Sequence, residues 1–218
     1  MTIAPARWAV IAALLLGMTG SAHSQQPRIA RQDQSAGDMA RRIRQAIMTD
    51  PIAPAVAPEG ADVTIVLFSD YNCPYCRKVH PALQALLRED PKVRLLYRDW
   101  PIFGGASTEA ARAAIAAEFQ GRHTAFNEAL MAAQGKLDSA AIRTAANRAG
   151  VDWTRLQKDL TARRQDIDAL LGRSDRYARM LGLTGTPGLL IGPYLLPGAV
   201  GVAELRKVVA AVRARPET

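Results

Sequence analysis

Two cysteines separated by two residues are the side chains of this chain best suited to do chemistry. Cys73 and Cys76 enclose Pro74 and Tyr75, and they are the only cysteines among the 218 residues. A bridge between them would close too small a loop to constrain the unfolded chain, so a purely stabilising disulfide is disfavoured. A structural zinc ion needs about four ligands, and His80 is the only candidate nearby. The pair is therefore interpreted as a redox centre.

The residues on either side of the pair predict a strand followed by a helix. The segment 63–68 reads VTIVLF, a continuous apolar and β-branched run that is typical of a strand buried on both faces. Pro74 suits the first turn of a helix, and apolar residues follow it at helical spacing. Cys73 is therefore placed at a helix N-terminus, where free N–H groups and the helix dipole favour a thiolate. We expect Cys73 to be more exposed than Cys76, to have the lower pKa and to react first.

The remaining segments predict an α/β order with a helical block in its middle. A second strand is expected over 92–98, and a hairpin across Gly192-Pro193 joins strands at 189–191 and 194–196. The predicted order is β-α-β, a helical block, then β-β-α. Helices are expected over 107–120, 123–133, 139–148, 152–171 (running on towards residue 181) and 202–213.

Three sequence motifs together resemble one family. FSDYNCPYCRKVHP, GTPGLLIG and LLPGAV are similar to the DsbA-like branch of the thioredoxin superfamily, and most similar to exported proteins of the Com1 and ScsC type. The resemblance covers about residues 50–212. It implies an α/β fold, the thioredoxin fold with an inserted helical subdomain, and thiol–disulfide exchange as the activity.

The resemblance also implies roles for individual residues. Cys73 and Cys76 are the catalytic pair and form the redox-active disulfide, and Pro74 and Tyr75 between them tune the active site. Thr186-Pro187 is assigned to substrate binding. The family places a cis-proline beside the CxxC, and the residue before that proline offers its backbone to the substrate as an added strand pairing.

One position departs from the pattern of the family. Many relatives carry a glutamate six residues before the first cysteine, where it can relay a proton, whereas this chain has Leu67 there. An apolar residue beneath the pair removes a buried negative charge that would raise the thiol pKa. Proton transfer must then use water or another group such as Asp70, although an aspartate in such a loop is usually solvated.

These features predict an exported thiol–disulfide oxidoreductase that exchanges disulfides with thiol- or disulfide-containing protein substrates. The direction of exchange, oxidase or isomerase, stays open. No organic cofactor or metal is required, and a membrane-bound or soluble redox partner must reset the pair. The alternative is a thioredoxin-fold protein that holds Cu(I) with the same thiols and has no turnover, because thiolates are suitable soft ligands.

The first residues of the chain predict export to the periplasm. A single positive charge within residues 1–7, an apolar run over 8–17 and Ala22-His23-Ser24 before a cleavage point are typical of a signal peptide that ends at about Ser24. An uncleaved anchor is the alternative, although the run is short for a membrane span of about 20 residues. The net charge is +8, but the basic residues are scattered and no aromatic residues interleave with them, so nucleic acid is not expected as a partner.

The segment between the signal peptide and the catalytic domain predicts self-assembly. Residues 25–58 form an N-terminal extension, and residues 59–215 form the DsbA-like domain with its helical insertion at about 105–181. Within the extension, Met39, Ile43 and Ile47 form an apolar stripe with no assigned place in the core. Such a stripe must be covered by its own domain or by another subunit. The resemblance to isomerase-type relatives favours a homo-oligomer held by residues 25–58.

Overall fold

The computed structural model describes residues 26–215, so the predicted signal peptide over residues 1–24 lies outside the described part of the chain. The chain divides into two compact units at Arg41. Helix α1 (Gln26–Met48) contributes to both units, and the ion pair between Asp38 and Arg41 lies in the first. Among the described residues, no helix is both long enough and apolar enough to cross a membrane.

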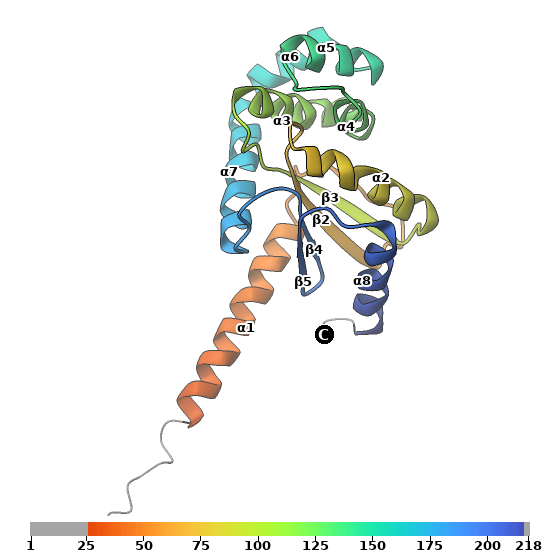
Figure 1. Ribbon diagram of the computed structural model, residues 1–218. Coiled ribbons are helices and arrows are strands. Elements are labelled where there is room, and N and C mark those ends of the chain that lie inside the picture. The colour runs from red at the N-terminus through yellow and green to blue at the C-terminus, as the bar shows by residue number, and fades with distance from the viewer. Residues whose placement is uncertain (1–25, 216–218) are drawn as a thin grey trace, which may run out of the picture. The chain divides into compact units, whose positions relative to one another are not determined.

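The second unit is built on a five-stranded mixed sheet (Figure 1). The strand order is β1-β3-β2-β4-β5, in which β2 and β3 are parallel and every other neighbouring pair is antiparallel. Strand β2 is central and covered on both faces, which explains its nearly continuous apolar sequence. The strands are β1 (Ala55–Val56), β2 (Val63–Ser69), β3 (Val93–Asp99), β4 (Gly188–Ile191) and β5 (Tyr194–Pro197).

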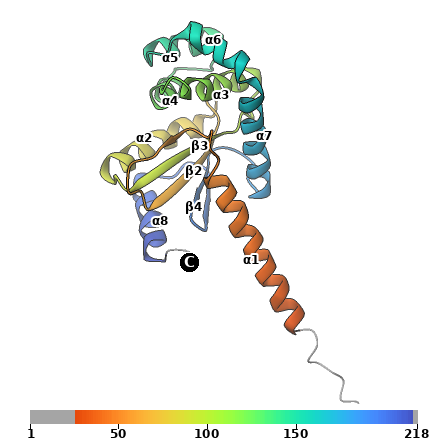
Figure 2. The same cartoon turned by 180° about the vertical axis from the view of Figure 1, so that it is seen from behind.

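Helices cover both faces of this sheet (Figure 2). On one face, α2 (Pro74–Glu89) and α8 (Val202–Ala214) bury Leu83 and Leu205 against Ile65 of β2. On the other face, residues 42–48 of α1 and helix α7 (Arg164–Met180) pack against Phe68 of the same strand. Alternate residues of β2 therefore belong to two different cores.

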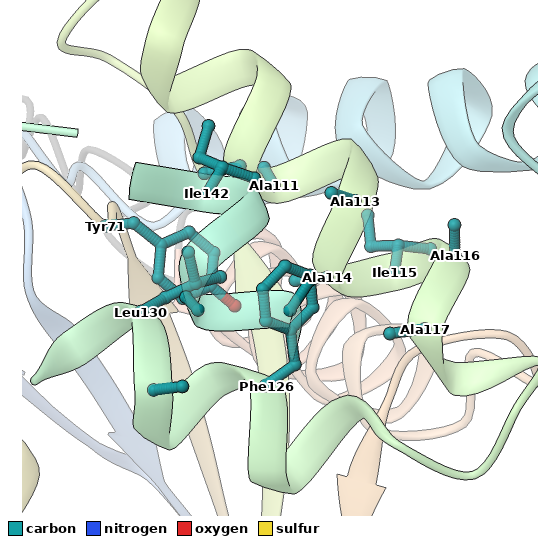
Figure 3. Close-up of a cluster of buried hydrophobic side chains, with 14 of the residues drawn as sticks. Tyr71, Ala111, Ala113, Ala114, Ile115, Ala116, Ala117, Phe126, Leu130 and Ile142 are labelled. Carbon is teal, nitrogen blue, oxygen red and sulfur yellow. The ribbon is translucent and has the colours of Figure 1, made fainter. Parts of the chain in front are cut away.

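A block of helices separates β3 from β4, as the sequence predicts. It consists of α3 (Gly105–Glu118), α4 (His123–Met131), α5 (Ser139–Arg148), α6 (Trp153–Ala162) and α7. Helix α3 is rich in buried alanines, and the small side chains let neighbouring helices approach it closely. Figure 3 shows these alanines beside Phe126 and Leu130 of α4. We call this cluster, which also includes Tyr71 and both cysteines, the helical core.

The expected single helix from residue 152 towards residue 181 is wrong, because the chain forms two helices that meet at Arg163. Backbone angles of φ −106° and ψ 16° at Arg163 interrupt the helix there. A continuous helix over 153–180 would be about 42 Å long and could not follow the surface of a small helical block. The break lets Leu156 and Ile167 both reach the helical core.

The apolar stripe of α1 is partly covered by its own chain. Ile47 is fully buried, and Ile43 packs against the same cluster as Val66 and Phe68. The expectation that the stripe has no place in the core is therefore wrong for these two residues. Met39, by contrast, is 57% exposed.

A buried ionic network fixes the segment that follows α1. The Arg98 guanidinium is fully buried and its Nη1 donates to Oδ2 of Asp50 at 2.8 Å. Arg173 of α7 donates from Nε to the same oxygen at 2.7 Å and from Nη2 to Oδ1 at 3.0 Å. The Arg98 guanidinium also lies 5.2 Å from the centre of the Tyr177 ring. These partners compensate the cost of burying the charges, and they connect the segment to β3 and α7.

Candidate functional site

The cysteine pair lies where the central strand gives way to the first long helix. Strand β2 ends at Ser69, and Cys73 is the N-cap residue of α2, with Pro74 in its first turn. The Cys73 amide donates to the Asp70 carbonyl oxygen at 3.1 Å, and the Cys76 amide donates to the Cys73 carbonyl oxygen at 3.1 Å. The predicted placement of Cys73 at a helix N-terminus is therefore confirmed.

A segment far along the chain closes over Cys73. The Cys73 thiol donates to the carbonyl oxygen of Thr186 at 3.1 Å, across 113 residues of sequence. The Thr186-Pro187 peptide bond is cis, as the resemblance implies. Strand β4 starts at the next residue, and Gly188 pairs with Phe68 of β2. This antiparallel pairing brings the two predicted elements of the site together.

The expectation that Cys73 is more exposed than Cys76 is wrong. Both side chains are 1% exposed, because the helical block and the Thr186-Pro187 segment cover them together. A difference in exposure therefore cannot account for a difference in reactivity.

Hydrogen bonding distinguishes the two thiols instead. The Cys76 thiol beside it lowers the pKa of Cys73 to about 6, helped by the backbone amides of Cys76 and Tyr75 and opposed by burial. The same contact with Cys73, together with burial, raises the pKa of Cys76 well above its usual range. Cys73 is thus the thiolate at neutral pH, and Cys76 retains its proton.

The two residues between the cysteines differ in accessibility. Pro74 starts the helix, whereas the Tyr75 side chain is 61% exposed beside the pair. Arg77, which the sequence does not single out, donates from Nε and Nη2 to the Tyr71 carbonyl oxygen at 3.2 and 3.0 Å. Its Nη1 reaches the carbonyl oxygen of Gly135. Arg77 thus links the loop before the cysteines to the helical insertion.

Asp70 is buried, and the expectation of a solvated loop residue is wrong. It is 1% exposed, and its Oδ1 accepts from the Asn72 amide at 2.8 Å and from the Ser107 hydroxyl at 2.7 Å. Its Oδ2 accepts from the amides of Ile102 and Phe103 at 2.7 and 3.0 Å. The Asp70 backbone amide in turn lies 3.5 Å from the Cys76 sulfur, to which it donates. One carboxylate therefore holds three segments around the pair.

The position of the missing family glutamate is apolar, and a different acid lies buried nearby. Leu67 is 2% exposed and packs against α2. Asp99, at the end of β3, is 3% exposed, and burial raises its pKa to about 7. The sequence does not single out Asp99, because an acid at the end of an apolar strand usually marks the start of a solvated loop. Its pairing with Ser69 across the parallel strands shows that it is level with the last residue of β2.

No set of three or more histidine, cysteine or acidic side chains within residues 26–215 is arranged to hold a metal ion.

Comparison with known proteins identifies the family. A family model described as thioredoxin matches residues 54–211, which include every site residue described above. The chain belongs to the thioredoxin family. Within this superfamily, it is a DsbA-like protein.

Solved structures of similar proteins share the fold. A thioredoxin-like oxidoreductase from Silicibacter pomeroyi is 41% identical, with a TM-score of 0.75 over 78% of this chain and 98% of that one. A periplasmic thioredoxin-like protein from Salmonella enterica serovar Typhimurium is 30% identical, with a TM-score of 0.68 over 79% and 96% of the two chains. The thiol-disulfide exchange protein alpha-DsbA2 from Wolbachia pipientis is 27% identical, with a TM-score of 0.76 over 84% and 98%.

The curated relatives are much longer proteins. A Na(+)/H(+) antiporter NhaA 3 from Salinispora tropica is 32% identical over an alignment of 174 residues that covers 73% of this chain. The chain spans 25% of the length of that relative. The similarity is therefore to a part of the antiporter sequence.

Proposed function

We propose that this thioredoxin-family protein exchanges disulfides with protein substrates in the periplasm through the Cys73–Cys76 pair. The observation that carries the proposal is the pairing of a low-pKa thiol at the N-terminus of α2 with a buried, protonated thiol one turn later. The Wolbachia relative is a thiol-disulfide exchange protein, which supports the proposal.

The exchange uses the two sulfurs in sequence. In the oxidised protein, a substrate thiolate attacks the Cys73 sulfur, the Cys73–Cys76 bond breaks, and Cys76 leaves as a thiolate. A second substrate thiolate then attacks the substrate sulfur of the mixed disulfide, so that the substrate disulfide forms and Cys73 is released. In the opposite direction, the Cys73 thiolate attacks a substrate disulfide and Cys76 resolves the intermediate. The low pKa of Cys73 stabilises the reduced protein, and this makes the oxidised protein a stronger oxidant.

Thr186 and Pro187 form the proposed substrate-binding segment. The Thr186 carbonyl oxygen lies 3.1 Å from the Cys73 sulfur, so an extended substrate that pairs with this backbone would have its own sulfur next to Cys73. Tyr75 is exposed beside the same sulfur and can contact the substrate. Pro74 sets the start of the helix that presents Cys73.

Turnover by metal-free protein tests this function. We expect the protein to reactivate a substrate with scrambled disulfides, or to reduce insulin, and Cys73→Ser to abolish both reactions. Cys76→Ser should instead accumulate a mixed disulfide through Cys73. A metal-free protein without turnover that retains copper in stoichiometric amounts would establish the Cu(I)-binding alternative. Equilibration with glutathione then gives the reduction potential, which distinguishes an oxidase from an isomerase or reductase.

We further propose that the protein is a homo-oligomer held by its N-terminal extension. Met39 is exposed on α1 and supports this assembly. Removal of the whole extension would be a poor test, because it would also remove Ile47 from the core. Light scattering on Met39→Glu is sharper, since this variant leaves the core intact. Equal masses for the variant and the unaltered protein, both monomeric, would exclude assembly through this residue.

A further inference from the structure

A group of buried polar side chains lies on the sheet face beneath the cysteine pair. Within the described residues, neither carboxylate oxygen of Asp99 makes a hydrogen bond of normal geometry, and neither does the Tyr71 hydroxyl, although the two groups are near enough to interact. Buried polar atoms are nearly always paired with protein or with ordered water. Such a carboxyl is available to exchange a proton.

The strand register places Asp99 on the same side of the sheet as α2. Side chains alternate along a strand, so Asp99 points to the face used by Tyr97. Tyr97 packs in the same cluster as Leu67 and the α2 residue Val79. Asp99 is therefore on the face that carries the cysteine helix, one strand away from Leu67 and one step closer to the cysteine loop.

Tyr71 connects this carboxyl to the cysteines. Its ring belongs to the helical core together with Cys73 and Cys76, and Figure 3 shows it beside Leu130. Its side chain also interacts with Asp99. Burial of the Tyr71 hydroxyl, together with the negative charge of Asp99, holds the Tyr71 pKa well above its usual range. Tyr71 therefore keeps its proton, and a phenol hydroxyl can both donate and accept a hydrogen bond.

We propose that Asp99 is the internal proton acceptor and donor for Cys76, acting through the Tyr71 hydroxyl and ordered water. The inference rests on the proposed disulfide exchange and assigns the group that handles its proton. It replaces Asp70 in this role. All four hydrogen bonds of the Asp70 carboxylate come from donors fixed in the structure, so both of its oxygens are already engaged.

The charged and titratable groups around Asp99 are consistent with this role. Burial raises its pKa to about 7, the nearby charge of Asp70 adds to the rise, and the Tyr71 hydroxyl opposes it. On the other side, the Tyr97 ring packs against His123 of α4, with the ring centres 4.7 Å apart and the planes tilted by 57°. The charge of Glu128, from the same helix, also acts on Tyr97. Burial lowers the pKa of His123 to about 3, so this imidazole is a much weaker base than Asp99 near pH 7.

The proton that Cys76 loses or gains in each half-reaction is taken up or supplied by Asp99. When Cys76 resolves a mixed disulfide, its thiol proton passes to the Asp99 carboxylate and its sulfur attacks Cys73. The Cys73–Cys76 bond forms, and the substrate leaves as a thiolate. In the reverse direction, a substrate thiolate breaks the Cys73–Cys76 bond and protonated Asp99 returns the proton to Cys76. Asp99 ends each full cycle in its starting state.

The reactions of the two sulfurs can be resolved by stopped flow. The reduced protein is mixed with an aromatic disulfide that releases a coloured thiolate. The first coloured thiolate appears when Cys73 attacks the reagent, and the second appears when Cys76 resolves the mixed disulfide. We expect the second phase to rise with pH through an inflection near 7, the pKa of Asp99. In Asp99→Asn, the second phase should slow about tenfold at pH 7 and lose this inflection, at the lower end of typical general-base effects. The first phase should stay unchanged.

Two further variants make the test specific. Tyr71→Phe keeps the carboxyl and removes the connecting hydroxyl, so it should slow the second phase while the inflection persists. Glu118→Gln neutralises a carboxyl whose pKa is also raised, at the other end of α3 from the site, and should reproduce the unaltered profile. Asp99→Asn should fold, because the amide has nearly the size and shape of the carboxyl and can still face the Tyr71 hydroxyl.

The outcomes separate this inference from the proposed function. Absence of both phases in the unaltered protein would refute disulfide exchange itself. Two normal phases with an unchanged second phase in Asp99→Asn would overturn the role of Asp99 alone. Equal slowing of both phases in that variant would also overturn it, since it would indicate a purely structural role.

Discussion

Replacement of Asp70 by alanine should destabilise the reduced protein more than the loss of an ordinary loop carboxylate. The substitution removes the acceptor for three backbone amides and one hydroxyl: those of Asn72, Ile102, Phe103 and Ser107. It does so at a position where the carboxylate itself is 1% exposed.

The magnitude follows from the number of donors left without a partner. A buried donor without an acceptor costs about 1–3 kcal/mol. Ile102 and Phe103 have exposed side chains, so water can reach their amides and reduce the cost at these two sites. We therefore expect a loss of roughly 3–5 kcal/mol in the free energy of unfolding, or about 6–20 °C in Tm for a chain of this size.

Urea unfolding of the reduced protein, followed by circular dichroism, measures this loss. Asp138→Ala is the matched control. Asp138 caps α5 and accepts a single backbone hydrogen bond, from the Ala141 amide at 2.7 Å, so its removal should cost only about 1 kcal/mol. If Asp70→Ala costs no more than Asp138→Ala, the four hydrogen bonds do not stabilise the loop as argued.

Three more outcomes are expected. Alkylation of the reduced protein at about pH 6 should label Cys73 and spare Cys76, because hydrogen bonding lowers the pKa of Cys73 to about 6. Peptide mapping that finds the adduct mainly on Cys76 would contradict this. Asp50→Asn should cost about 3–5 kcal/mol by leaving the Arg98 charge buried without its partner. Burial opposes ionisation of Asp50, but hydrogen bonds from two arginines outweigh it and lower the pKa of Asp50 in the folded protein. Its stabilisation is therefore present above its unfolded pKa and is lost as the pH falls through the folded value. Acid titration of the unaltered protein should show this loss and the variant should not. Gly188→Ala should lower the free energy of unfolding by about 1–3 kcal/mol, since its Cβ would meet Leu183 Cδ1 at 2.6 Å. Gly105 has open space around it, so Gly105→Ala should not destabilise the protein. Equal midpoints of the two variants in urea would refute the steric argument.

The parts of the site that the sequence predicts are those set by local rules. A continuous apolar strand, a proline in the first turn and a cysteine before it determine where Cys73 lies on α2, whatever the rest of the chain does. The burial of Cys73 has a different origin. It depends on Thr186, and no pattern within a few residues of the pair reveals that contact.

The same limit applies to the two buried carboxyls. Asp70 and Asp99 both follow or end apolar strands, where an aspartate is usually solvated. Their burial depends on tertiary packing, because Ser107 of the helical insertion donates to Asp70 and the Tyr71 side chain lies against Asp99. The break at Arg163 also depends on tertiary packing, because the apolar spacing continues through it.

The covered position of Cys73 has a consequence for the durability of the thiol. A thiolate with a pKa of about 6 is a good target for peroxide, and its oxidation beyond the sulfenic acid is irreversible. Here the sulfur is 1% exposed, and the Thr186 carbonyl occupies the approach to it. A small reagent, whether an oxidant or an alkylating agent, gains no main-chain pairing from displacing that backbone and should react slowly, whereas an extended polypeptide can replace it with new main-chain pairing. The same geometry therefore protects the sulfur from damage between encounters and opens it to a polypeptide.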